Sequence, residues 1–449
     1  MGDRIKILDL FNEQETVWKQ RAADGIECYR KGNGRIIVTD KNGEPIANAK
    51  IKLTQTSHEF RFGANIFMLD ELETEEKNEK YKKYFADVFN MATLPFYWNT
   101  LEPERNNPRY AKDSKKVYRR PAPDLCIEFC EKHGIEPREH ALAYDNFFPE
   151  WLYGASSEEI KKELERRYSE IAERYADKIP TIEVTNEMEW QNGRTVFYDD
   201  ADFVEWCFKT AEKYFPNNQL CINEWTGLCW EDRCRVTDKY YAYIEANMLK
   251  GAPIDAIGMQ YHLFNRREDE YKCTRATLDP QNLYRHMDLY MGLGKPLQIT
   301  EITVPSYSWE AEDEEIQAEI IEKLYSIWFS HPAIEQIIYW NLVDGYAHVW
   351  DPDPEKIRAS QGNMSLGENY YHGGLLRFDM TPKPAYYKIK ELLQERWHTE
   401  AELVTDDDGC AEFRGFYGDY SVVISSGEEV TNTKISISKA SENSIGIVL

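Results

Sequence analysis

Short apolar runs alternate with amphipathic segments through most of the chain. Segments of helical length separate the runs, and in 158–175 the residues Ile160, Leu164 and Tyr168 fall on one stripe. Alternating strands and helices predict a parallel sheet with crossover helices, and eight such units close into a (β/α)8 barrel. The predicted strands are 60–66, 91–98, 136–144, 180–187, 218–225, 254–262, 296–302 and 335–342.

The two ends of the chain have a different pattern from the predicted barrel at 58–399. After an amphipathic helical segment over 1–32, residues 33–57 show short alternating strands around an Asn-Gly turn, and 400–449 have the same character. Because an isolated hairpin is marginally stable, we predict that both pieces pair into one discontinuous β-sandwich. Two separate appendages are the alternative. We expect its aromatic residues, such as Tyr420, to form its own core, which gives it a structural rather than a carbohydrate-binding role.

The amino-acid composition indicates which partners and which cellular compartment to expect. The 449 residues carry a formal net charge of −25, and an acidic surface repels nucleic acid and anionic lipid, so we expect neither as a partner. Nine cysteines without paired C-x-x-C spacing predict free thiols in a reducing environment rather than zinc ligands. No apolar leader follows Met1, which predicts a cytoplasmic protein; a leader removed ahead of Met1 would indicate secretion.

Two glutamates at the ends of predicted strands suggest a reaction. Glu187 ends the fourth strand and Glu301 lies near the end of the seventh. Hydrolysis of a sugar bond needs two carboxylates, because one donates a proton while the other attacks the anomeric carbon or activates water. The amide of Asn186 could hold a sugar hydroxyl beside Glu187, which favours Glu187 as the acid. Glu301 is then the nucleophile, with His262 as a hydrogen-bond donor, although a core role for this histidine is the alternative.

Further polar and aromatic residues collect at the same strand ends. A lone acidic residue there is more often part of an ion pair or a cap, but eight groups converging on one face favour a functional site. No H-x-H or H-E-x-x-H spacing occurs, so we predict no metal. The candidate substrate-binding residues from this pattern are His140, Tyr144, Asn186, Asn223, Gln260, His262 and Trp340.

A series of motifs in fixed order carries a family resemblance over 60–397. Together they resemble glycoside hydrolase family 10, the retaining β-1,4-xylanases with a (β/α)8 fold. The motifs are Phe-Arg-Phe-Gly-Ala at 60–64, Trp98 through Glu102-Pro103, Glu-His-Ala-Leu at 139–142, Pro-Glu-Trp at 149–151, Thr-Asn-Glu at 185–187, Ile-Asn-Glu-Trp at 222–225, Gly-Met-Gln-Tyr-His-Leu at 258–263, Ile-Thr-Glu at 299–301 and the tail at 375–386.

The resemblance implies double displacement on an oligosaccharide with no cofactor. Glu187 would protonate the leaving group, Glu301 would form a glycosyl-enzyme, and Glu187 would then activate water. Asn186 would hold the 2-hydroxyl of the sugar. By the same resemblance, Trp98 is a further candidate for substrate binding. The residues implied around the −1 subsite are His140, Gln260 and His262, with Trp340 as its floor.

Departures from the family pattern concern the glycone side, which holds the sugars on the non-reducing side of the cleaved bond. The family's Glu-Asn-x-x-Lys-Trp is Thr-Leu-Pro-Phe-Tyr-Trp at 93–98, and its Trp-His-x-Gln is Tyr-Asp-Asn-Phe at 144–147. Its Trp-Gly after the last strand is Trp340-Asn341 here, and a later aromatic falls near His348 or Trp350. We therefore predict a retaining β-glycosidase for xylan-derived or related β-1,4-linked oligosaccharides. The alternatives are an exo-acting or non-xylan β-glycosidase, for example for a plant glycoside, and a catalytically silent sugar-binding barrel.

Overall fold

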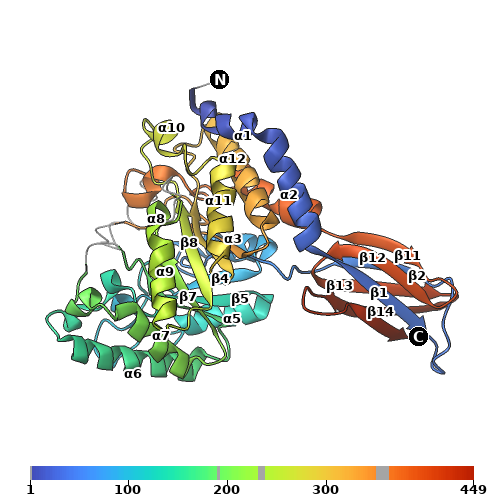
Figure 1. Ribbon diagram of the computed structural model, residues 1–449, viewed down its shortest axis with the longest axis horizontal. Coiled ribbons are helices and arrows are strands. Elements are labelled where there is room, and N and C mark those ends of the chain that lie inside the picture. The colour runs from blue at the N-terminus through green and yellow to red at the C-terminus, as the bar shows by residue number, and fades with distance from the viewer. Residues whose placement is uncertain (1–2, 190–192, 231–237, 350–363) are drawn as a thin grey trace.

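A closed barrel of eight parallel strands makes up the larger part of the molecule. The computed structural model describes residues 3–189, 193–230, 238–349 and 364–449, and Trp350 lies outside them. Every predicted barrel strand is present, and two smaller β-sheets accompany the barrel, so the predicted fold class is confirmed (Figure 1). In barrel order the strands are β10 (Ile334–Tyr339), β3 (Arg61–Asn65), β4 (Met91–Pro95), β5 (Glu136–His140), β6 (Thr181–Asn186), β7 (Gln219–Glu224), β8 (Ala256–His262) and β9 (Leu297–Thr303).

Helices cover the outside of the barrel. Ser156 is the N-cap of the amphipathic helix α6 (Ser157–Tyr175), where its hydroxyl and the Glu159 carboxylate form a reciprocal capping box. The helices that follow barrel strands are α3 (Glu75–Val88), α4 (Trp98–Leu101), α5 (Pro123–His133), α6 (Ser157–Tyr175), α7 (Phe203–Tyr214), α8 (Thr226–Trp230), α9 (Lys239–Leu249), α10 (Glu270–Cys273), α11 (Pro280–Met291), α12 (Ala311–Ser330) and α14 (Pro384–Glu391).

The barrel strands are buried on both faces, which explains why they read as continuous apolar runs. Every residue of β4, β6 and β9 is buried, because helices cover the outer face and side chains fill the interior. All eight strands run parallel, so their carboxyl ends meet at one mouth. Polar residues at those ends therefore converge even when they are far apart in the sequence.

The two smaller sheets combine strands from both ends of the chain and share one apolar core, which includes Leu53, Tyr420 and Ile424. One sheet has the order β12–β1–β15 and the other β11–β2–β13–β14, beside the barrel in Figure 1. The exact domain boundaries stay predictions. The strands are β1 (Lys31–Thr39), β2 (Lys50–Gln55), β11 (Glu400–Val404), β12 (Cys410–Phe416), β13 (Gly418–Ser426), β14 (Glu429–Ile437) and β15 (Ser444–Val448).

An N-terminal helical segment packs on the barrel and leads into β1 (Figure 1). A Cβ atom at Gly25 would lie 2.3 Å from the carbonyl oxygen of Ser330, so only glycine permits this contact with α12. The eight cysteines that the structure describes are free thiols, and six of them are buried. None of the helices in the described ranges is long and apolar enough to cross a membrane. The segment consists of η1 (Asp3–Leu8), α1 (Asp9–Glu13) and α2 (Glu15–Tyr29).

Candidate active site

The two glutamates singled out in the sequence lie at the mouth of the barrel. Glu187 follows β6 directly, and Glu301 belongs to β9 and is only 3% exposed. Glu187 has a φ of +53°, an uncommon conformation for a residue other than glycine. Its backbone N–H donates to the carbonyl oxygen of Asn223 at 3.1 Å, which holds this turn against the end of β7. The fold thus brings both carboxylates together, while their catalytic roles stay predictions.

A continuous chain of hydrogen bonds connects the two carboxylates. Gln260 Nε2 donates to Glu187 Oε1 at 3.1 Å and to Asn186 Oδ1 at 3.3 Å. Asn223 Nδ2 donates to the same Asn186 oxygen at 3.0 Å and to Glu301 Oε1 at 3.1 Å. We call these five residues the carboxylate network. Since the three amide side chains are almost completely buried and hydrogen-bonded, they hold the two carboxylates in a defined relative position.

Tyr144 supplies a second donor to Glu187. Its hydroxyl donates to Glu187 Oε2 at 2.5 Å, so each carboxylate oxygen accepts a hydrogen bond from a different side chain. Burial raises the pKa of Tyr144 well above its ordinary value, and the neighbouring Glu187 adds to the shift. The phenol is therefore protonated at neutral pH and can act as a donor.

Glu301 is held on its other oxygen by His262. The imidazole Nε2 lies 3.1 Å from Glu301 Oε2, and Nδ1 lies 2.9 Å from the hydroxyl of Thr303. Burial lowers the pKa of His262 to about 4, so the ring is neutral at ordinary pH. In the tautomer with hydrogen on Nε2, His262 donates to Glu301 while the Thr303 hydroxyl donates to Nδ1.

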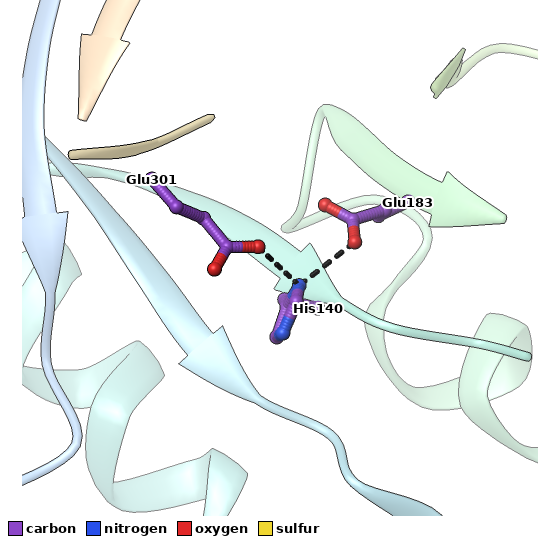
Figure 2. A group of neighbouring side chains, drawn as sticks. All are labelled: His140, Glu183 and Glu301. Carbon is purple, nitrogen blue, oxygen red and sulfur yellow. Dashed lines mark hydrogen bonds and ion pairs between the residues drawn. The ribbon is translucent and has the colours of Figure 1, made fainter. Parts of the chain in front are cut away.

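His140 lies between Glu301 and a third buried carboxylate, Glu183 (Figure 2). Its Nδ1 donates to Glu183 Oε1 at 2.8 Å and is 4.0 Å from Glu301 Oε1. Arg138 contacts the other oxygen of Glu183 at 2.5 Å. Burial lowers the pKa of His140, but Glu183 and Glu301 outweigh this effect and raise the pKa above its usual value. Burial likewise opposes ionisation of Glu183, yet His140 and Arg138 hold its pKa below the usual range.

Among the described residues, His140, Glu183 and Glu301 also form a group whose ligand atoms lie within 4.8 Å of one another. These are therefore the residues that could hold a metal ion. The Nδ1 atom of His140, however, carries the proton that it donates to Glu183, which leaves no lone pair on that atom for a metal. We interpret the group as a hydrogen-bonded arrangement that orients Glu301.

Glu301 has a strongly shifted proton affinity. Burial raises its pKa to about 8, and the neighbouring carboxylates of Glu183 and Glu187 act in the same direction. His140 opposes the shift. At neutral pH the raised pKa favours the protonated form of Glu301, whereas His140 favours the ionised form that a nucleophile needs.

An aromatic group borders the carboxylates. Phe67, Tyr97 and Trp340 form a small buried cluster, which we call the aromatic wall, and Tyr144 packs against it. The ring of Trp340 lies 5.4 Å from that of His140 and 5.2 Å from that of Phe67, measured between ring centroids. The hydroxyl of Tyr97 lies 2.9 Å from His140 Nε2. Trp340 therefore packs on His140, and its role as the floor of the −1 subsite stays a prediction.

Trp98 does not join this group. Its Nε1 donates to Glu102 Oε2 at 2.8 Å, and its ring packs against Trp151 at 5.6 Å and against Phe148 at 5.1 Å. The chain enters the short helix α4 at this point, so adjacent side chains diverge and Tyr97 contacts His140 instead. Trp98 thus packs away from the aromatic wall, and its role in substrate binding stays a prediction.

Glu183 and Arg138 were not predicted from the sequence as residues of the site. Both are fully buried charged residues inside barrel strands, and this contrast with the apolar runs around them was the available signal. Glu224, which follows Asn223, accepts hydrogen bonds from the backbone N–H groups of Trp225 at 3.0 Å and Glu189 at 3.1 Å. Glu224 therefore holds the backbone that follows Glu187 in position.

The comparisons with known proteins agree with this geometry. The model of the family described as Glycosyl hydrolase family 10 matches residues 54–392. Among curated proteins, the chain is 26% identical to Endo-1,4-beta-xylanase 2 of Arabidopsis thaliana, over 90% of this chain and 34% of that protein. It is 25% identical to Anti-sigma-I factor RsgI6 of Acetivibrio thermocellus, over 91% of this chain and 46% of that protein. The chain thus spans less than half the length of these two relatives.

Solved structures show the same fold. Native xylanase 10B from Thermotoga maritima has a TM-score of 0.57 at 24% sequence identity, covering 75% of this chain and 96% of that one. Xylanase 10B from Thermotoga petrophila RKU-1, in complex with xylobiose, also has a TM-score of 0.57 at 24% identity and covers 75% of this chain and 95% of its own. At this level of identity the likeness concerns the fold alone.

Proposed function

Since the chain belongs to glycosyl hydrolase family 10, as its motifs predicted, we propose that it is a retaining β-glycosidase. Its substrates would be β-1,4-linked xylan-derived or related oligosaccharides. The observation that carries the proposal is the carboxylate network, in which Glu187 and Glu301 are joined through buried amides but receive different further donors. The names of the curated relatives, several of which are endo-1,4-β-xylanases, support the substrate class.

The geometry suggests a double displacement. Glu187 would donate its proton to the glycosidic oxygen as Glu301 attacks the anomeric carbon, which releases the leaving group and forms a glycosyl-enzyme. Glu187 would then take a proton from water, whose oxygen displaces Glu301 with net retention. His262 and Asn223 donate to Glu301, which orients it and stabilises its ionised form.

A second candidate concerns the glycone. Tyr97 stands where the resemblance implies a lysine that holds glycone sugars, and its hydroxyl is engaged by His140 at 2.9 Å. A site built for one pattern of sugar hydroxyls rejects others strongly, because unpaired buried polar groups cost about 1–3 kcal/mol each. This difference favours an exo-acting enzyme or a non-xylan glycone. A catalytically silent barrel is less consistent with two glutamates that are both hydrogen-bonded at the mouth.

A substrate panel tests the proposal. Aryl β-glycosides and short β-1,4 oligosaccharides, xylo-oligosaccharides included, are incubated with the native enzyme and with Glu301→Gln. Glu335→Gln makes the same chemical change at the opposite end of the barrel, where Glu335 accepts a hydrogen bond from Gln298 at 2.7 Å. We expect turnover by the native enzyme and by Glu335→Gln but not by Glu301→Gln. Failure of the native enzyme on every substrate would contradict the enzymatic proposal.

The stereochemistry of the product tests the nucleophile assignment separately. Nuclear magnetic resonance spectra taken immediately after addition of enzyme distinguish the anomer that forms first from the one that appears by mutarotation. We expect the β-anomer, as retention requires. An α-anomer would show that water attacks directly, and Glu301 would then be a general base.

A further inference from the structure

Two consecutive arginines lie next to the aromatic wall. Arg119 and Arg120 belong to the connection between α4 and α5 and are only 3% and 7% exposed. Buried guanidinium groups normally have a carboxylate partner or a full set of acceptors. In the described part of the chain, neither residue of this arginine pair forms an ion pair, a property that they share with the buried Arg30, Arg109 and Arg167.

The guanidinium atoms without a hydrogen-bond partner are those with which an arginine binds a carboxylate. Arg119 uses Nη1 alone, donating to Asn341 Oδ1 at 2.8 Å and to the carbonyl oxygen of Tyr346. Arg120 likewise uses only Nη1, which donates to the carbonyl oxygen of Arg119 at 2.9 Å. The Nε atoms of both are buried without a hydrogen-bond partner among the described residues, and their Nη2 atoms form no hydrogen bond there either. Nε and Nη2 form the edge of a guanidinium that binds both oxygens of a carboxylate.

In several other arginines of the same chain this edge is engaged. Arg4 donates through Nε and Nη2 to the two carboxylate oxygens of Glu270, at 2.9 and 3.0 Å. Two arginines that lack such a partner, Arg30 and Arg167, direct both atoms at backbone carbonyl oxygens. The Nε of Arg138 is also without a partner, but its Nη2 contacts Glu183. The arginine pair differs from these arginines because neither Nε nor Nη2 has an acceptor among the described residues.

The position of the arginine pair connects it to the active site. The guanidinium carbon of Arg120 lies 3.7 Å from the ring centroid of Tyr97, whose hydroxyl contacts His140. Arg119 holds Asn341, which directly follows Trp340. The arginine pair therefore borders the aromatic wall where the resemblance implies the lysine and other polar residues of the glycone side. A group carried by a glycone sugar would meet these side chains.

The arginine pair also gives this part of the site a positive potential. Burial lowers the pKa of Arg120 to about 10, so its guanidinium still carries its charge at neutral pH. Burial lowers the pKa of His348 to about 3, and the positive charges of Arg119 and Arg120 contribute. Glu368 is the nearby carboxylate that acts on Arg120, but it accepts its hydrogen bond from Asn341 Nδ2, at 3.3 Å. The local positive charge contrasts with the net charge of −25 on the whole chain.

We propose that the arginine pair binds the carboxylate of a uronic acid on the glycone side of the substrate. This inference rests on the proposed glycosidase function and specifies its substrate class. A carboxylate would supply the two acceptor oxygens that Nε and Nη2 of Arg120 lack, in a charge-assisted bidentate contact. A neutral sugar would leave these donors unpaired, so the site would discriminate between the two.

Two matched substrate pairs test the proposal. 4-Nitrophenyl β-D-glucuronide and 4-nitrophenyl β-D-glucoside differ only in a carboxylate at C6, and xylo-oligosaccharides with and without a glucuronic acid branch extend the comparison to more distant glycone subsites. We expect the native enzyme to prefer the acidic member of at least one pair. Arg120→Gln should lower kcat/KM for that member by roughly 10- to 100-fold while changing the neutral member by less than about threefold. Arg120→Lys keeps the charge but not the planar edge. Its kcat/KM for the acidic member should lie between the values of the native enzyme and Arg120→Gln.

Arg109→Gln provides the control for a purely structural effect. Arg109 donates to three backbone carbonyl oxygens, two of them in this connection, including that of Arg120 at 3.2 Å. If Arg120→Gln acted only by loosening the connection, both variants would affect acidic and neutral substrates equally, and the proposal would be wrong. A native enzyme that cleaves only neutral substrates would also overturn it while leaving the glycosidase function intact. Absence of turnover on every substrate would instead count against the proposed function itself.

Discussion

The carboxylate network and the aromatic wall with its arginine pair lie at the same mouth of the barrel, but their polar atoms differ in hydrogen bonding. In the first, each oxygen of Glu187 and Glu301 accepts a hydrogen bond from an identified side chain. In the second, aromatic rings and two guanidinium groups with unpaired atoms replace the polar residues that the family resemblance implies. The difference indicates that bond cleavage and substrate selection can change independently in this barrel, because different strand-end segments supply their residues.

The largest expected effect lies in the carboxylate network. Glu301→Gln removes the proposed nucleophile but keeps the size of the side chain, so kcat should fall by roughly 10⁴-fold or more on acidic and neutral substrates alike. Initial rates with an aryl glycoside measure the loss, and a thermal unfolding scan controls for folding. A loss confined to one class of glycone would break the proposed division between the two regions.

Replacement of the acid should depend on the leaving group. Glu187→Gln should lower kcat by about 10²–10⁴-fold for oligosaccharides, because a sugar leaving group needs a proton. A nitrophenolate leaves without protonation, so the first step with nitrophenyl substrates should be much less affected. Pre-steady-state release of nitrophenol measures that step directly. Equal losses for both kinds of leaving group would argue that Glu187 is not the acid.

The pH dependence tests the ionisation of Glu301. Burial raises the pKa of Glu301 to about 8, so its carboxyl group is protonated below that pH and ionised above it. Because a nucleophile must be ionised, kcat/KM should rise by about tenfold per pH unit as the pH approaches 8. Profiles of kcat/KM from pH 5 to 10 on a neutral substrate check this. A profile that is flat or falls between pH 5 and 7 would contradict it.

Two matched tyrosine variants compare the regions directly. Tyr97→Phe removes the hydroxyl that contacts His140 at the aromatic wall, whereas Tyr144→Phe removes the donor to Glu187. Each should lower kcat/KM by about tenfold, the cost of one buried hydrogen bond. We expect the loss for Tyr97→Phe to differ among glycones and the loss for Tyr144→Phe to be uniform. The reverse pattern would show that the two regions are not separate.

The smallest effect on activity is expected far from the mouth. Phe416 of the β-sandwich is 3% exposed and stacks near Phe329 of α12, with ring centroids 6.1 Å apart. Phe416→Ala should lower the free energy of unfolding by about 3–5 kcal/mol, because it leaves a cavity between the sandwich and the barrel. Below the unfolding temperature, kcat/KM should change by less than about twofold. A selective loss of activity or of polymer binding would argue against a structural role for the sandwich.

Much of the fold was predicted from local patterns of apolar and polar residues in the sequence. All eight barrel strands were predicted because a strand buried on both faces must be an apolar run between turn signals, and α6 was predicted from its stripe and ends within a residue of the expected range. Glu187, Glu301 and their amide neighbours were also recognised, since parallel strands bring their carboxyl ends together. The contacts of Trp98 could not be predicted from the strand pattern, because a one-turn helix sets the direction of its side chain.

By itself, the sequence determined the order of strands and helices, the family motifs and the identities of the two carboxylates, since these depend on residues close together along the chain. Only the tertiary structure decided what surrounds them. Glu183 acquired its importance from His140 and Arg138, and the arginine pair from aromatic residues of other segments. The physical reason is that burial and hydrogen-bond partners depend on contacts between distant segments, and these contacts set the proton affinities of the site and leave the donors of the arginine pair without partners.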